Sequence, residues 1–311
     1  MFLEINDLSV KIENKNILKN LNLNINKGEV HAIMGPNGSG KTCLLQMFTG
    51  DNSHCYTNDL TMFGIKRGTG ESIWDIKKHI GIMSNALHMQ YKVNASVEHV
   101  IISGFHDSIG LYTRPTLAER MVAEQWLEVL GLKQKKNTPF QSLSFGDQRL
   151  VLIARSMVKP PAVLILDEPT AGVDVELRSN LWKNVKSLNK QGVTIILTTH
   201  YLLEAEEMCD RIGILNKGNL VALDSTKNLL KRIQTKIVTF VVNGKVNIEN
   251  QSLKSLNVID NQPGQLIVSY EKSLLNIGEL INYINKQNIK ISDISTDDGN
   301  LEDVFVRLTK N

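Results

Sequence analysis

The sequence predicts an α/β protein whose core is a buried parallel sheet. Residues 162–166 and 193–197 are continuous apolar runs bounded by turns or helices, and such runs are typical of strands buried on both faces. Segments with helical periodicity precede them. After residue 230 the pattern changes to short strands and helices, which predicts a small separate α+β unit.

Composition limits the class of protein. A chain of 311 residues is long enough for two domains of about 150 residues each. Charges are balanced, with 35 basic and 32 acidic residues, so bulk charge gives no indication of nucleic-acid binding. The three cysteines form no C-x-x-C pair, which argues against a disulfide framework or a zinc site and favours a reducing compartment. The longest apolar runs are too short to span a bilayer, and no signal-peptide pattern is present.

The first 35 residues favour strands. Polar and apolar residues alternate over 21–26, the period of a half-buried strand. A turn at Lys27-Gly28 leads into a short apolar strand over 29–34, and residues 41–48 follow as a helix.

Two helices are expected in the middle of the chain. The first begins at Thr116, which forms a capping box with Glu119, and its apolar residues are expected to face the core: Leu117, Met121, Trp126, Val129 and Leu130. The second covers 146–158 and ends at Pro160-Pro161.

A hairpin and an accessory unit complete the prediction. Residues 211–224 are expected to form a hairpin that turns at 216–219. Beyond residue 230 we expect strands over 238–242, 265–270 and 289–294, and helices over 273–285 and near 301–308.

A phosphate-binding loop is the most specific motif. Its residues fit G-x-x-x-x-G-K-[ST] between an expected strand and an expected helix. The loop amides would surround phosphate oxygens, Lys41 would reach the β- and γ-phosphates, and the Thr42 hydroxyl would bind Mg²⁺. A glycine-rich turn without a ligand is the alternative. The residues are Gly35, Pro36, Asn37, Gly38, Ser39, Gly40, Lys41 and Thr42.

Two adjacent carboxylates end the apolar strand over 162–166. Asp167 and Glu168 would face the same crevice as the phosphate loop, because ligands bind beyond the carboxyl ends of parallel strands. Asp167 would hold Mg²⁺, and Glu168 would act as general base or position the attacking water. An acidic pair that merely ends the strand is the alternative.

With these motifs the chain resembles the nucleotide-binding subunits of ATP-binding cassette (ABC) proteins over residues 2–225. LSFGDQR at 143–149 resembles the family signature LSGGQ, AGVD at 171–174 resembles the D-loop, and TTH at 198–200 resembles the switch-histidine segment. The resemblance implies an ABC-type P-loop fold with an antiparallel β subdomain and a helical subdomain. The expected domains are 1–230, with the helical subdomain at about 86–160, and 231–311.

The resemblance also implies a Mg²⁺-dependent ATPase that closes as a head-to-tail dimer of two copies or of this chain and a paired ABC subunit. Ser144 and Gly146 of one subunit would contact the γ-phosphate bound by the other, and Asp174 would lie at the same interface. His200 would contact the γ-phosphate and the water-positioning residues. A separate transmembrane permease is implied as partner, and the chain would lie in the cytoplasm on the inner face of the membrane.

Several positions depart from the family pattern. Phe145 replaces a glycine and Asp147 a glutamine of the signature, which we expect to weaken or alter closure. Asn85 stands where a magnesium-binding glutamine is expected, and its side chain is one methylene shorter. Ile12 lies near the position of an adenine-stacking aromatic residue, so affinity for the base is expected to be reduced.

Different stretches resemble different relatives. Residues 1–50 resemble the ATPase of the Suf iron–sulfur assembly system, 55–165 a molybdate-related soluble ATPase, and 166–311 the ABC-2-type, drug-resistance exporters. One hypothesis is a recombined chain with seams near 50–58 and 160–166. The other is a single divergent protein.

Three functions remain open at this stage. The first is the ATPase of an exporter, supported by residues 166–311. The second is a soluble assembly or repair ATPase, because the helices near 90–140 would form the permease groove and here resemble a non-transport relative. The third is a nucleotide clamp with little turnover, suggested by Asn85 and Asp147.

Overall fold

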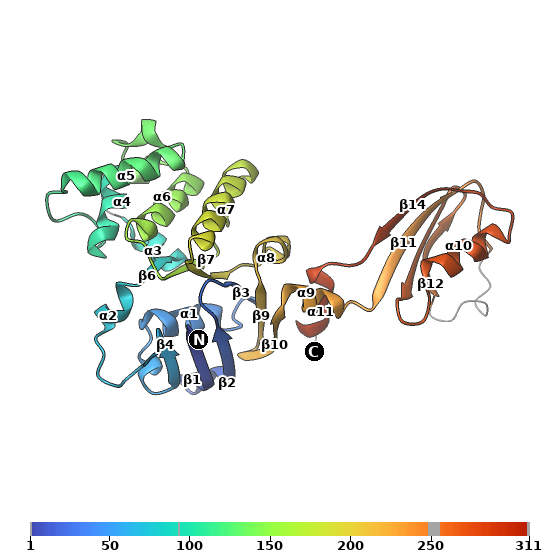
Figure 1. The fold of residues 1–311 in the computed structure, drawn as a ribbon, viewed down its shortest axis with the longest axis horizontal. Coiled ribbons are helices and arrows are strands. Elements are labelled where there is room, and N and C mark those ends of the chain that lie inside the picture. The colour runs from blue at the N-terminus through green and yellow to red at the C-terminus, as the bar shows by residue number, and fades with distance from the viewer. Residues whose placement is uncertain (1, 93, 248–255, 310–311) are drawn as a thin grey trace. The chain divides into compact units, whose positions relative to one another are not determined.

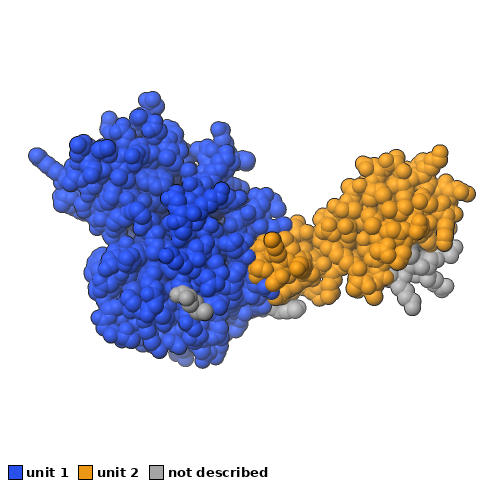
Figure 2. Space-filling model, viewed as in Figure 1, with its two compact units in different colours: residues 1–224 blue, residues 225–311 orange. Residues whose placement is uncertain are grey.

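A computed structural model describes residues 2–92, 94–247 and 256–309 of the protein. The chain divides into two compact units, residues 1–224 and 225–311 (Figure 2). The sequence placed this division near residue 230. Each unit is described by itself.

An antiparallel sheet opens the first unit, with the strand order β2-β1-β4-β5. The expected strands near the N-terminus are present, and β1 and β2 form a hairpin whose turn residues Glu13 and Asn14 both have positive φ. The strands are β1 (Leu3–Ile12), β2 (Lys15–Ile25), β4 (Asp59–Met62) and β5 (Ile65–Lys66).

A six-stranded sheet forms the centre of the first unit, in the order β10-β9-β3-β8-β7-β6. β9, β3, β8, β7 and β6 pair with one another in parallel, as the apolar runs predicted. The strands are β3 (Val30–Met34), β6 (Ile80–Met83), β7 (Val163–Asp167), β8 (Thr194–Thr198), β9 (Arg211–Asn216) and β10 (Asn219–Ser225).

The expected hairpin over 211–224 is confirmed as β9 and β10. Its turn residues Lys217 and Gly218 have φ angles of 48° and 84°. A left-handed pair of this kind matches the twist of the two strands.

Helices pack around the central sheet, and α3 to α6 gather on one side of it (Figure 1). Five of the helices of this unit are α1 (Lys41–Thr49), α2 (Ile73–Lys77), α3 (Asn85–Gln90), α4 (Val97–Ile102) and α5 (Leu117–Val129). The others are α6 (Phe145–Met157), α7 (Val175–Lys190) and α8 (Leu202–Met208). The α/β fold with an antiparallel sheet and a helical part is therefore confirmed.

The expected core face of α5 is wrong, although its capping box of Thr116 and Glu119 is confirmed. Leu117 is 76% exposed, Met121 56% and Val129 52%. The buried residues are Ala123 and Leu127. These two lie four positions apart and share one face, and this narrow face packs against α4 and α6.

In its described residues, 225–247 and 256–309, the second unit has a four-stranded antiparallel sheet in the order β12-β13-β11-β14 and three helices. Its core is formed by residues such as Phe240, Val268 and Leu280. The strand β12 was not expected, and Asn276 caps α10, which begins four residues later than predicted. The elements are α9 (Thr226–Lys231), β11 (Thr235–Val242), β12 (Leu256–Gln262), β13 (Gln265–Glu271), α10 (Ile277–Asn285), β14 (Ile291–Asp297) and α11 (Leu301–Thr309).

Candidate active site

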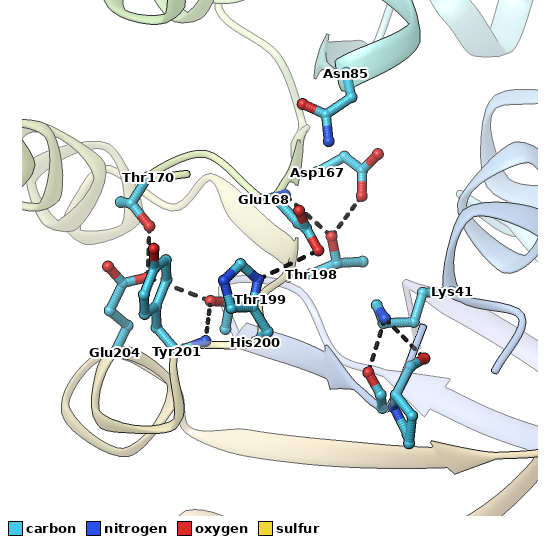
Figure 3. A network of polar contacts seen from close by, with 12 residues as sticks. Lys41, Asn85, Asp167, Glu168, Thr170, Thr198, Thr199, His200, Tyr201 and Glu204 are labelled. Carbon is cyan, nitrogen blue, oxygen red and sulfur yellow. Dashed lines mark hydrogen bonds and ion pairs between the residues drawn. The ribbon is translucent and has the colours of Figure 1, made fainter. Parts of the chain in front are cut away.

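The candidate site lies at the edge where four adjacent parallel strands end. The phosphate loop follows β3, and His200 follows β8. Asp167 ends β7, Glu168 comes directly after it, and Asn85 follows β6 (Figure 3). Because the carboxyl ends of parallel strands meet at one edge, residues far apart in sequence come together here.

The phosphate loop connects β3 to α1 and needs its glycines. A Cβ on Gly35 would lie 2.3 Å from the main-chain oxygen of Leu215, and one on Gly40 would lie 2.6 Å from Cδ2 of Leu18. Gly38 has a φ of 77°, a conformation that L side chains rarely adopt. Pro36 and Asn37 are exposed, whereas Ser39 is buried. A close-packed turn with free amide groups at a helix N-terminus is suited to phosphate.

The Lys41 side chain lies inside this loop. Its ammonium donates to the main-chain oxygens of Gly35, at 2.8 Å, and Pro36, at 3.2 Å. Burial lowers the pKa of Lys41, and the carboxylates of Glu168 and Asp167 oppose this shift. A cation held near two carboxylates can neutralise phosphate charge. Thr42 is exposed in the first turn of α1.

The acidic pair is held from the neighbouring strand. Thr198 donates its hydroxyl to Oδ1 of Asp167 at 2.5 Å, and the main-chain N–H of Glu168 donates to the Thr198 main-chain oxygen at 3.0 Å. Glu168 has a φ of 49°. A non-glycine residue costs about 1–2 kcal/mol in this left-handed region, and strain of this kind is found mainly at functional sites.

His200 lies beside the second carboxylate. Its Nδ1 is 3.4 Å from Oε1 of Glu168, and its ring packs on Tyr201 with centroids 4.3 Å apart. The predicted histidine and the predicted base are therefore neighbours, as Figure 3 shows.

A buried carboxylate that the sequence analysis missed supports the His200 segment. Glu204 accepts a hydrogen bond from the Thr170 hydroxyl at 2.9 Å and another from Thr199 at 3.4 Å, and it lies 3.4 Å from Nε of Arg178. It thus ties the segment after β8 to the segment after β7. The only sequence feature that pointed to Glu204 was the presence of an acidic residue on the helix that follows His200.

Arg149 was also missed, and it contacts two of the predicted site residues. Its guanidinium donates to Oδ1 of Asn85 and to the main-chain oxygen of Glu168. Burial lowers its pKa, while Glu168 and Asp167 raise it. The sequence feature that could have identified Arg149 is its position inside the apolar stripe of the helix over 146–158. A charged side chain is buried in such a stripe only when it has polar partners.

The signature-like segment 143–149 begins α6. Ser144 caps this helix by accepting from the N–H of Asp147 at 3.2 Å. Asp147 is buried and ion-paired with Lys135 at 2.7 Å. Phe145 is 48% exposed and packs on His88, with centroids 4.6 Å apart. A Cβ on Gly146 would meet nothing closer than 3.8 Å, so packing within one chain does not explain this glycine.

Part of the predicted site is not assembled within one chain. Asp174 caps α7 by accepting from the N–H of Leu177 at 2.9 Å. No hydrogen bond or ion pair among the described residues joins Ser144, Gly146 or Asp174 to the phosphate loop. Ile12 is 44% exposed at the end of β1.

The oxygen atoms that the site offers as metal ligands fit a Mg²⁺ ion bound together with a phosphate group. Among the described residues no group of three or more His, Cys, Asp and Glu side chains could hold a metal ion by itself. Asp167 and the Thr42 hydroxyl supply only oxygen, and magnesium is usually bound by one or two carboxylates together with substrate phosphates and water. No helix in the described part of the chain is long and apolar enough to cross a membrane.

Comparison with known proteins agrees with this geometry. Residues 18–171 match the family model described as "ABC transporter". The chain is 43% identical over 226 residues to the ABC transporter ATP-binding protein ModF of Escherichia coli, covering 72% of this chain and 46% of ModF. The chain therefore spans about half the length of that relative.

Two further relatives carry export or resistance in their names. The linearmycin resistance ATP-binding protein LnrL of Bacillus subtilis is 28% identical over 301 residues, covering 95% of this chain and 94% of LnrL. The Nod factor export ATP-binding protein I of Ralstonia nicotianae is 30% identical, covering 73% of this chain and 68% of the relative. The match to LnrL is long enough to run across both expected seams.

Solved structures share the fold. CbiO1 of Clostridium perfringens, described as part of the ABC transporter complex cbiONQ, superposes with a TM-score of 0.63 at 28% identity, covering 75% of this chain and 94% of cbiO1. The ATP-binding cassette MJ0796, in a dimeric form bound to ADP and Pi, superposes with a TM-score of 0.61 at 24% identity, covering 72% of this chain and 99% of the cassette. The chain belongs to the ATP-binding proteins of ABC transporters, a family whose members hydrolyse ATP.

Proposed function

We propose that this protein is the ATP-binding and ATP-hydrolysing subunit of an ABC exporter. The observation that carries the proposal is the meeting of Lys41, Asp167, Glu168 and His200 at one edge of the central sheet. The reaction is the Mg²⁺-dependent hydrolysis of ATP to ADP and phosphate.

Nucleotide binding would use the phosphate loop. Amides of the loop from Gly35 to Gly40 bind phosphate oxygens, and Lys41 exchanges its main-chain partners for the β- and γ-phosphates. Thr42 and Asp167 would hold Mg²⁺, which would supply positive charge against the phosphates. Exposed Ile12 offers the base an aliphatic contact instead of stacking.

Hydrolysis would use Glu168 and His200. The Glu168 carboxylate accepts a hydrogen bond from the attacking water and orients it, and a base placed in this way contributes about 10²–10⁴-fold to rate. Its position is fixed because the main chain of Glu168 is held on both sides, by Thr198 and Arg149. His200 lies beside the carboxylate, its side chain is half exposed, and it would contact the γ-phosphate.

A head-to-tail dimer would complete the site. Ser144 and Gly146 lie at the N-terminus of α6, where the helix amides favour an anion. Among the described residues no hydrogen bond joins these two residues to the phosphate loop. Asp174 would lie at the same interface. The similarly folded MJ0796 forms a dimer, which supports a dimer for this protein. Phe145, unlike glycine, adds a large ring to that interface.

A membrane permease is the proposed partner, and the protein would act at the cytoplasmic face of the membrane. A groove of about 400 Å³ is lined by residues from α1, α2, α3 and the segment before α5, among them Trp74, Leu87 and Ile109. Trp74 is 63% exposed. A groove of mixed polar and apolar lining with an exposed tryptophan can receive a partner helix. The names of LnrL and the Nod factor protein favour export.

A soluble, non-transport ATPase is the second candidate. The resemblance of residues 55–165 to a molybdate-related soluble ATPase favours it. Copurification from a native membrane tests the two: an exporter subunit is recovered with a polytopic membrane protein, whereas the second candidate is recovered without one.

Glu168→Gln tests hydrolysis itself. The amide keeps the shape but is a poor base, so the rate of ATP turnover should fall by about 10² or more, and the ATP-bound dimer should accumulate in a mass measurement. Glu207→Gln removes an exposed carboxylate from α8 and is the matched control. Equal turnover in Glu168→Gln and the unchanged protein would show that Glu168 is not the base. If the protein is instead a nucleotide clamp, the unchanged protein itself would hydrolyse ATP slowly.

A further inference from the structure

Arg149 lies at the junction of three segments that the reaction needs. It is on the first turns of α6, 2% exposed, and is the last residue of the signature-like segment 143–149. One guanidinium nitrogen donates to Oδ1 of Asn85, at the start of α3, and another donates to the main-chain oxygen of Glu168, after β7. Neither contact involves the phosphate loop.

The contact with Glu168 limits the freedom of the proposed base. The N–H of Glu168 donates to Thr198, and its carbonyl accepts from Arg149. With both flanking peptide groups held, the residue keeps its φ of 49°, and the direction of the carboxylate follows. Arginine suits this task because its planar guanidinium presents several donors in a fixed geometry.

The contact with Arg149 bears on the expected role of Asn85 as a magnesium ligand. An amide oxygen that accepts a hydrogen bond from a guanidinium keeps a second lone pair, but the positive charge beside it opposes the binding of Mg²⁺. The Arg149 partner therefore disfavours the expected metal role of Asn85. Its position in the site is explained by Arg149 instead.

The third contact reaches the surface. The Arg149 guanidinium lies 5.0 Å from the centroid of the Phe145 ring, a cation–π distance. Phe145 is half exposed at the helix N-terminus. A change at Phe145 can therefore reach Glu168 through one side chain.

We propose that Arg149 is a positioning residue that connects Phe145 and Asn85 to the water-orienting carboxylate of Glu168. The proposal rests on the proposed ATPase function. Loss of Arg149 should lower kcat and leave ATP affinity unchanged, because Arg149 touches the segment that orients water and not the loop that binds phosphate.

The first experiment compares Arg149→Met and Arg149→Lys in the full chain, with Arg67→Met as the matched control. Arg67 is equally buried, at 2% exposed, and has a cation–π contact with Tyr56 at 5.3 Å, but it lies outside the site. We expect Arg149→Met to lower kcat about tenfold or more with Kd for ATP within about twofold of the unchanged protein. Arg149→Lys should recover part of kcat because a lysine can reach one of the two oxygens. Arg67→Met should change only the melting temperature.

The second experiment is a double-mutant cycle with Asn85→Ala. If the two residues act together, Asn85→Ala lowers kcat less than Arg149→Met does, and the double variant is no slower than Arg149→Met alone. Asn85→Gln should leave the Mg²⁺ concentration for half-maximal rate unchanged. A lower value in Asn85→Gln would return this position to metal binding and overturn the assignment to Arg149.

The outcomes separate the inference from the proposed function. No turnover by the unchanged protein, with Mg²⁺ and ATP in excess, overturns the ATPase proposal itself. Turnover by the unchanged protein with an equal kcat in Arg149→Met, or independent effects in the cycle, overturns only the role of Arg149. A loss of kcat in Arg67→Met as large as in Arg149→Met also overturns it, because burial alone would then explain the loss.

Discussion

The hydroxyl of Thr198, at the end of β8, donates to Oδ1 of Asp167, at the end of β7, over 2.5 Å. The same hydroxyl accepts from the main-chain N–H of Glu168 at 3.1 Å. One side chain thus sets the orientation of the proposed metal-binding carboxylate and the main chain of the proposed base. Strand pairing of β7 with β8 provides this arrangement.

Thr198→Val is expected to slow ATP turnover by about tenfold, because the isosteric side chain no longer donates to Asp167. The variant should also lose about 1–2 kcal/mol of the free energy of unfolding, since a buried acceptor loses its donor. Denaturant unfolding and steady-state kinetics measure the two effects. Thr194→Val is the control: its hydroxyl, on the same strand, accepts from Gly28 at 3.0 Å outside the site. Equal kinetics in both variants would contradict the prediction.

Lys41→Ala is expected to abolish ATP binding. The substitution removes the cation that lies inside the phosphate loop, and no other side chain in the loop carries a positive charge. Calorimetric titration with ATP measures the loss. Lys27→Ala, which removes an exposed lysine from the turn before β3, should bind ATP normally. Tight binding by Lys41→Ala would refute the role given to Lys41.

His31 is expected to make the protein less stable in acid. Burial in β3, with a smaller contribution from the Arg211 cation, lowers the pKa of His31 from 6.5 to about 3. Between these values the unfolded chain binds a proton that the folded chain does not. The free energy of unfolding therefore falls by about 1.4 kcal/mol per pH unit as pH decreases through this window. His31→Leu should flatten this dependence in urea unfolding at pH 4, 5, 6 and 7. Parallel curves for the two proteins would count against the prediction.

The recombination hypothesis predicts separate folding units. A poorly matched seam should let residues 55–160 exchange their amide hydrogens independently of the rest of the first unit. Hydrogen exchange followed by mass spectrometry tests this directly. The pairing of β6 with β7 and the contact of Arg149 with Glu168 both cross the seam near 160–166. A mismatch there should therefore change the hydrogen exchange of these segments. Uniform protection across 1–224 would exclude a mismatched seam.

Local patterns were sufficient for much of the fold. The turn at 216–219, the capping box of Thr116 and Glu119 and the buried strand before Asp167 were all predicted from a few neighbouring residues. Turn chemistry, capping and strand periodicity are properties of short segments. The face of α5 was not predicted correctly, because its partners α4 and α6, and not its own periodicity, select Ala123 and Leu127 for burial.

The sequence by itself determined the phosphate loop and the acidic pair, because glycines that permit the loop and carboxylates at a strand end are read from adjacent positions. Only the tertiary structure decided that Arg149 holds Asn85 and Glu168 together, and that Glu204 supports the His200 segment. Arg149 is 64 residues from Asn85, and Glu204 is 34 residues from Thr170. The order of strands in the central sheet brings these partners to one edge. Such hydrogen bonds depend on the distance between side chains in the folded protein, and the pattern of neighbouring residues in the sequence does not determine that distance.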